Sequence, residues 1–281
     1  MHDLGPLATL EAWRAASAEQ RAAVGIALAD KTGLPEEDPV GTARFRALRH
    51  GSGVTLVAIP GGVYRAGLTD ADLYTLFVHL GDGSVARWDE IRREVALASP
   101  RIARVAPFLC AAQQWGDEGP ARFEDEPWNH PLGFIEEHLR AHHARLPTAD
   151  EWEWVAREGG ATPWVGVSPA ALPLAPRKIP DLDFGKPNGF GVGNLLMSEV
   201  GELVSDDEGR SLRGGHAMWQ DDLEAIALLC GYRWPLSDET HLPFRIACSL
   251  GLPPPDGDPP PLTVPDDDVG RAVRRFRGGQ P

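Results

Sequence analysis

One pair of histidines in this chain has a spacing that suits metal binding. His138 and His142 stand four residues apart in the segment from Pro131 to His143, whose apolar residues recur at helical spacing. Two histidines one turn apart on a helix can chelate a metal ion. The alternative is a solvated helix with histidines near its C-terminus, where the helix dipole favours positive charge. No third ligand stands nearby, which favours the alternative.

A second set of candidate ligands lies closer to the C-terminus. His216, Cys230 and His241 would together offer the nitrogen and sulfur ligands that transition metals accept, and they are the candidate catalytic residues of the chain. The alternative is that they are unrelated loop and core residues. Cys230 follows the apolar run from Ala225 to Leu229. A buried thiol is usually inert, so this run favours packing over chemistry.

The same region holds side chains suited to recognition. Trp219, Asp221, Asp222 and Arg245, together with His216, would line a binding groove. Aromatic residues and arginine are the usual anchors of protein interfaces. The alternative is that Trp219 and Arg245 hold the fold. Neither a glycine-rich phosphate loop nor a Gly-x-Ser-x-Gly nucleophile elbow is present, so the sequence offers no sign of phosphoryl-transfer or hydrolase chemistry.

Composition narrows the class of protein. The chain has 281 residues, a net charge of −14 and 42% hydrophobic residues, enough for one large domain with a substantial core. The negative charge argues against nucleic-acid and anionic-membrane partners, both of which need positive potential. Three widely spaced cysteines and the absence of an apolar leader in the first residues predict a protein of the reducing cytoplasm.

Capping patterns predict the helices that must position these residues. Thr148 and Glu151 form a capping box, in which each side chain binds the backbone N–H of the other. The helix that it opens should run through Ala156 and end at Gly159-Gly160. The pairs Ser17 with Gln20 and Thr69 with Asp72 predict two further helices, one ending at Gly33 and one running to residue 79, and residues 88–97 are a further candidate.

Short β-rich runs alternate with these helices. Strands are expected at residues 54–59, 63–67, 102–110, 202–205, 211–213 and 244–248. The chain divides into a helical N-terminal extension at 1–41, a main domain at 42–250 and a tail at 251–281. Within the extension, residues 34–39 are acidic and bounded by proline, which indicates a linker.

The tail is proline-rich first and highly charged afterwards. Three aspartates at 266–268 precede Arg271, Arg274, Arg275 and Arg277, a distribution that suits the dipole of a short helix. Val269, Val273 and Phe276 would share one side of that helix. The tail is then either a disordered end or a linker that presents an amphipathic helix to a polypeptide partner.

Several segments, taken in order, resemble the formylglycine-generating-enzyme or sulfatase-modifying-factor family over residues 52–250. Arg145 to Glu153 resembles that family's RLPTEAEWE signature, and Arg213-Gly214-Gly215-His216 resembles its RGGSW motif. The resemblance implies an α+β, C-type-lectin-like fold with long loops. The residues that carry this fold signature are Arg145, Pro147, Thr148, Glu151, Trp152, Arg213, Gly214 and Gly215; the other matching segments are 59–62, 105–108, 187–191, 200–206 and 244–247.

The departures from the family bear on function. Active members bind copper through a cysteine pair shortly after the RGGS motif, and residues 213–222 of this chain hold no cysteine. The resemblance therefore argues against copper. It leaves calcium as a candidate cofactor, although the Asn that helps to bind calcium in the family is missing from residues 198–203.

The sequence therefore predicts a non-catalytic family member that binds a polypeptide through the groove or the tail. The alternative is a divergent metal-dependent oxidase or protein-modifying enzyme that uses His216, Cys230 and His241. A third reading, calcium-dependent sugar binding, rests on the fold alone, because the usual Glu-Pro-Asn and Gln-Pro-Asp triplets are absent.

Overall fold

The computed structural model describes residues 4–80, 98–115, 130–160, 187–193, 195, 201–206, 209–214, 231, 242–259 and 261–277. This part of the chain holds six α-helices and nine β-strands, and all paired strands are antiparallel. The molecule is therefore an α+β protein, as the sequence predicts. The predicted helix at 88–97 lies outside the described residues.

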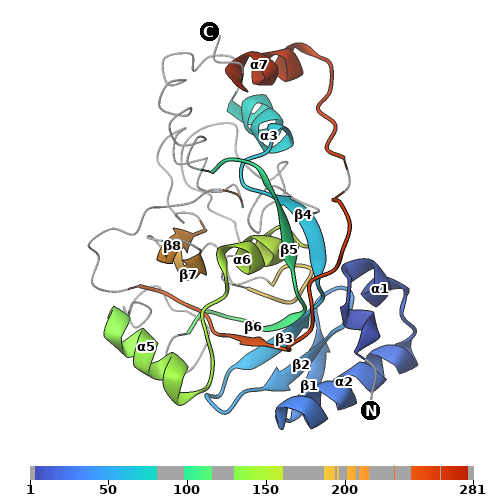
Figure 1. Cartoon of the computed structure of the whole chain (residues 1–281), viewed down its shortest axis with the longest axis vertical. Helices are drawn as coiled ribbons and strands as arrows, with labels where there is room; N and C mark the ends of the chain where they lie inside the picture. Colours follow the sequence, from blue (N-terminus) through green and yellow to red (C-terminus); the bar gives the residue numbers. More distant parts are fainter. Residues whose placement is uncertain are drawn as a thin grey trace.

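A five-stranded sheet forms the base of the molecule (Figure 1). At its centre, every residue of β3 from Leu56 to Ile59 is fully buried. Such a continuous apolar run is typical of a strand covered on both faces. The strand order is β1 (Glu36–Val40), β2 (Phe45–Arg49), β3 (Thr55–Ile59), β6 (Phe108–Ala111) and β9 (Ala247–Ser249).

The linker expected at residues 34–39 is wrong, because most of it forms edge strand β1. Glu36 pairs with Leu48 and Glu37 with Ala47 across the ladder to β2. The acidic side chains are held by basic partners on the neighbouring strand: Arg46 binds Glu36, and Arg49 binds Glu37 at 2.6 Å. Ion pairs to its neighbour thus stabilise a strand whose own residues have low β-propensity.

Helices α1 (Leu10–Ala15) and α2 (Ala18–Thr32) pack beside β1 and β2 (Figure 1). The predicted capping box at Ser17 is confirmed, and Gly33 ends α2 in the left-handed conformation at φ 70°. Trp13 is fully buried and its indole N–H donates to the carbonyl of Ala43 at 3.2 Å. The N-terminal segment therefore belongs to the same hydrophobic core as the sheet.

A two-stranded ribbon, β4 (Gly62–Ala66) with β5 (Arg101–Val105), leads from the sheet to α3 (Asp70–Leu80). The capping pattern of Thr69 and Asp72 is confirmed, since each side chain accepts a hydrogen bond from the other residue's backbone N–H, at 2.7 and 3.2 Å. Figure 1 shows α7 (Asp268–Arg277) lying across α3 at this end of the molecule.

Helix α6 (Ala149–Ala156) lies between the ribbon, the sheet and the hairpin of β7 (Glu202–Asp206) with β8 (Gly209–Arg213). Its capping box is confirmed: Glu151 N–H donates to Thr148 Oγ1 at 3.1 Å, and Thr148 N–H donates to Glu151 Oε2 at 2.8 Å. Every side chain of the helix except Asp150 is buried. α6 is thus the central helix of the fold.

Helix α5 (Leu132–Ala141) covers the sheet's other end. Its two buried residues are Ile135 and His138, while the apolar Leu132 and Leu139 are half-buried. A histidine therefore takes a core position.

Among the described residues, no helix is long and apolar enough to cross a membrane.

Candidate functional site

The segments that resemble the family's motifs come together around α6. The backbone of Arg145 forms two hydrogen bonds with Ala247 of β9, at 3.0 and 2.7 Å. Thr148 bridges to Ser205 of β7, and Leu203 bridges to Phe244. Segments far apart in the sequence thus meet at the N-terminus of one capped helix.

Arg245 holds this assembly from within and does not line a groove among the described residues. Its side chain is 1% exposed and forms a two-pronged ion pair with Glu202, which is equally buried. It also donates to the carbonyls of Ala111 and Gly193 at 3.0 and 3.1 Å. Gln114 completes the cluster by donating to Glu202 Oε2 at 3.1 Å. Of the two interpretations, the structural role of Arg245 is favoured.

A second buried network joins α6 to α3. Arg157 binds both carboxylate oxygens of Asp72, at 2.9 and 3.0 Å, and binds Glu153 at 2.8 Å. It also donates to the carbonyl of Gly67 at 2.9 Å, while Glu153 Oε1 accepts from the N–H of Gly67. Arg213 lies 3.6 Å from the other oxygen of Glu153. Two cations and two anions balance, so the network is neutral.

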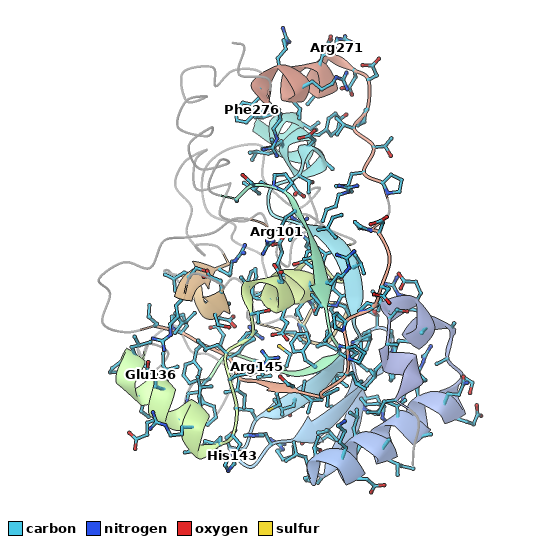
Figure 2. All side chains as sticks on the ribbon, in the orientation of Figure 1. Arg101, Glu136, His143, Arg145, Arg271 and Phe276 are labelled. Carbon is cyan, nitrogen blue, oxygen red and sulfur yellow. The ribbon has the colours of Figure 1, made fainter. Side chains whose placement is uncertain are left out.

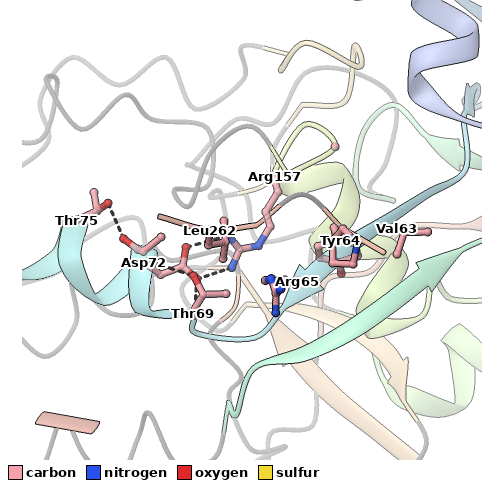
Figure 3. Close-up of a pocket in the computed structure, with 12 residues that line it drawn as sticks. Val63, Tyr64, Arg65, Thr69, Asp72, Thr75, Arg157 and Leu262 are labelled. Carbon is pink, nitrogen blue, oxygen red and sulfur yellow. Dashed lines mark hydrogen bonds and ion pairs between the residues drawn. The ribbon is translucent and has the colours of Figure 1, made fainter. Parts of the chain in front are cut away.

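A cavity of about 230 Å³ opens beside this network (Figure 3). Thr69, Asp72 and Arg157 form its polar side, and the hydroxyl-bearing Thr75 of α3 also lines it. The exposed Arg65 of β4 adds positive charge. Because Thr69, Asp72 and Arg157 are fixed by hydrogen bonds to one another, the polar side of the cavity is preformed.

The tail closes one side of this cavity. Pro259 and Leu262 line it, and Pro259 is buried while its described neighbours are exposed. Residues 252–265 run along the β4–β5 ribbon toward α7 (Figure 1), and Arg104 of β5 donates to the carbonyl of Gly257 at 3.0 Å. Sequence reasoning missed this cavity. Its walls come from β4, α3, the residues after α6 and the tail, which lie far apart in the sequence.

The described cysteines are ill suited to chemistry. Burial raises the pKa of the Cys110 thiol to about 12 and also raises the pKa of Cys248. Neither cysteine forms a disulfide. Because the thiolate is the nucleophile and the metal ligand, both groups are inert at neutral pH.

Four histidines meet aromatic rings under α5. The rings of His138 and His142 lie 4.4 Å apart, and Trp115 lies 3.9 Å from His138. Burial, with His142, His130 and His50 nearby, lowers the pKa of His138 to about 4. His138 is therefore a neutral ring at neutral pH, packed against Trp115 and His142. No group of three or more potential ligands in the described part of the chain is arranged to hold a metal ion.

The remaining predicted site residues lie outside the described residues. They are His216, Trp219, Asp221, Asp222, Cys230 and His241, with Gly215 of the fold signature.

A comparison of the chain with models of protein families found no match, and a comparison with curated proteins found no similar sequence.

Proposed function

We propose that this chain is a non-catalytic binding protein of the formylglycine-generating-enzyme type, with a C-type-lectin-like fold, and that it holds an extended polypeptide in a bacterial cytoplasm. The observation that carries the proposal is that Pro259, one of the residues that line the cavity, is buried. The surface already accommodates a proline of an extended chain, which here is the protein's own tail.

The convergence of the motif segments supports the family and fold. The segments at 145–153, 200–206 and 244–247 each resemble a motif of the family, and their described residues contact one another at the start of α6. A chance resemblance would not require such contacts. Shared architecture does not settle function, so the binding role rests on the cavity.

The neighbourhood of Pro259 supports a polypeptide ligand. A proline-rich strand has a preformed backbone conformation and loses little entropy when it docks. The cavity offers such a strand the apolar side chains of Val63 and Tyr64 together with the hydroxyls of Thr69 and Thr75.

The test uses the full-length Pro259→Ser protein, in which the cavity loses its own proline. We expect a labelled peptide with the sequence of residues 256–264 to bind this protein and to slow hydrogen exchange in residues 62–72. A peptide with its prolines replaced by serine should not bind. Thr75→Phe narrows the cavity and should abolish binding, while Val78→Phe, at an exposed position of the same helix, should not. Equal binding of both peptides would refute the proposal.

Metal analysis separates the proposal from the enzymatic alternative. We expect the purified protein to hold neither copper nor iron, and calcium to leave peptide affinity unchanged. Stoichiometric copper or iron that disappears in a His216→Ala, His241→Ala double variant would overturn the non-catalytic assignment. If the purified protein retains calcium and calcium raises its affinity for the peptide, the chain would instead hold a calcium site like that of the family, built from other residues.

A further inference from the structure

Helix α7 is held by one face of α3. Val273 and Phe276 are buried, and the ring of Phe276 meets Phe77 edge-on at 5.4 Å between centroids. Figure 2 shows Phe276 on the side of α7 that faces α3 and Arg271 on the opposite side. The face of α3 thus offers an apolar centre to a helix with apolar residues three positions apart.

Polar contacts fix the direction of α7 on that face. Arg277 Nε donates to Asp70 at 2.9 Å and Arg277 also binds the carbonyl of Leu68, both at the N-terminal end of α3. Tyr74 donates to Asp267 at 2.6 Å at the start of α7. The acidic end of α3 therefore faces the basic end of α7, which complements both helix dipoles.

Among the described residues, the segment between the sheet and α7 is held by a few contacts: Leu252 packs on the core, Arg104 donates to the carbonyl of Gly257, and Pro259 and Leu262 line the cavity. Seven of the fourteen residues from 252 to 265 are proline, and Pro259 is the buried residue among those described. Strand β9 ends at Ser249, before this segment begins. Release of the tail would therefore leave every described strand pairing in place and would break the hydrogen bond from Arg104 of β5 to Gly257.

A helix as short as α7 does not persist alone. It has ten residues, and isolated helices of this length are marginal in water, so α7 folds when it docks. Two of its other three arginines pair within the tail: Arg271 binds Asp268, and Arg274 binds Asp266. Docking therefore depends mainly on Val273, Phe276 and Arg277, a set that another polypeptide can match.

We propose that residues 252–277 are a displaceable intramolecular ligand, and that the cavity and the α3 face together receive a partner polypeptide with a proline-containing extended segment followed by an amphipathic helix that ends in arginine. This inference rests on the proposed polypeptide-binding function and adds the helix-binding face to it. The partner competes with the tail for Phe77 and Asp70. In the free protein the tail covers this surface, and binding of the partner displaces the tail.

The experiment measures peptide binding in trans to the full-length protein. The probe is a fluorescein-labelled synthetic peptide of residues 252–277, read by fluorescence anisotropy. A Val273→Ser, Phe276→Ser variant undocks the protein's own tail, and Arg275→Ser, at an exposed position of α7, is the matched control. If the tail is docked about nine-tenths of the time, the wild type and the control bind the probe about tenfold more weakly than the undocked variant.

A shorter peptide of residues 252–265 distinguishes the two proposals. If the shorter peptide binds the undocked variant as tightly as the full probe does, the α3 face adds nothing to binding. The proposed binding of a partner helix by α3 is then refuted, and the proposed binding of a proline-containing strand in the cavity stands. If neither peptide binds the undocked variant, both proposals fail. Equal binding of the full probe to wild type and variant would show that the tail does not block the site.

Folding and self-association are checked on the same samples. Unchanged hydrogen-exchange protection in β3 and faster exchange in α3 would show that the variant is folded with its tail released. Arg277→Glu removes the ionic contact and leaves the apolar core of α7 intact, and it should strengthen probe binding in the same direction. A wild-type dimer that the undocked variant loses would assign the surface to a second copy of the chain and overturn the proposal.

Discussion

The ion pair of Arg245 and Glu202 gives the sharpest test of how this fold is held. Arg245→Met keeps an unbranched side chain of similar reach but removes the guanidinium. Glu202 would then keep one described donor, Gln114, inside a site where its side chain is 1% exposed. The carbonyls of Ala111 and Gly193 would each lose a donor as well.

The magnitude follows from the burial of the pair. Removing one partner of a buried ion pair costs about 3–5 kcal/mol, because the other charge is left uncompensated. The total free energy of unfolding of a domain is about 5–15 kcal/mol, so this single change removes a large share of it. Replacing both residues by methionine leaves only neutral groups unpaired, at about 1–3 kcal/mol for each orphaned group. The double variant should therefore be less destabilised than the two single variants added together.

Urea denaturation of the two single variants and the double variant measures these differences as shifts in midpoint at constant slope. The matched control is Arg210→Met. It breaks the exposed Arg210–Glu136 pair, at 2.6 Å, and should cost at most about 1 kcal/mol. Two results would refute the view that Arg245 and Glu202 stabilise the fold as a unit. One is a double variant whose loss of unfolding free energy equals the sum of the losses in the two single variants. The other is an Arg245→Met variant that loses no more unfolding free energy than the Arg210→Met control.

Three further predictions concern single residues. Burial lowers the pKa of His138 to about 4 in the folded protein, so as pH falls the unfolded chain protonates this histidine before the folded chain does. The free energy of unfolding should therefore fall as pH drops from about 6.5 to 4. The His138→Phe variant should show a flatter dependence of unfolding free energy on pH in that range. Thr148→Ala loses the capping box of α6 and should cost about 1 kcal/mol, while Thr148→Ser should retain most of it. Cys110 should resist alkylation at pH 8 until the protein unfolds, and labelling of the native protein would contradict its burial.

Local signals made the helices predictable. The pairs at Ser17, Thr69 and Thr148 each form the capping hydrogen bonds that the sequence predicts, because a capping box involves only residues three positions apart. The left-handed glycine at Gly33 is equally local. Helix starts and ends of this kind need no knowledge of the tertiary structure.

Long-range partners made other features unpredictable. Glu36 and Glu37 form a strand because arginines on β2 pair with them, and their own sequence shows no strand preference. His138 takes a core position on α5 because Trp115 and Phe244 pack against its ring. The cavity depends on Pro259, which the folded tail brings to β4 and α3. In each case the deciding neighbour lies elsewhere in the chain.

The two buried networks and the tail differ in how firmly they hold their parts of the molecule. The Arg245 network ties β7 and the segment before β9 to β6. The Arg157 network ties α6 to the start of α3, so the cavity's polar side is rigid. The tail, by contrast, reaches the cavity through Pro259 and docks through one short helix. A preformed site spends little free energy on reorganisation, and a weakly held occupant can be replaced. The cavity is rigid and the tail that covers it is weakly held. This difference favours a surface on which a partner polypeptide replaces the protein's own tail.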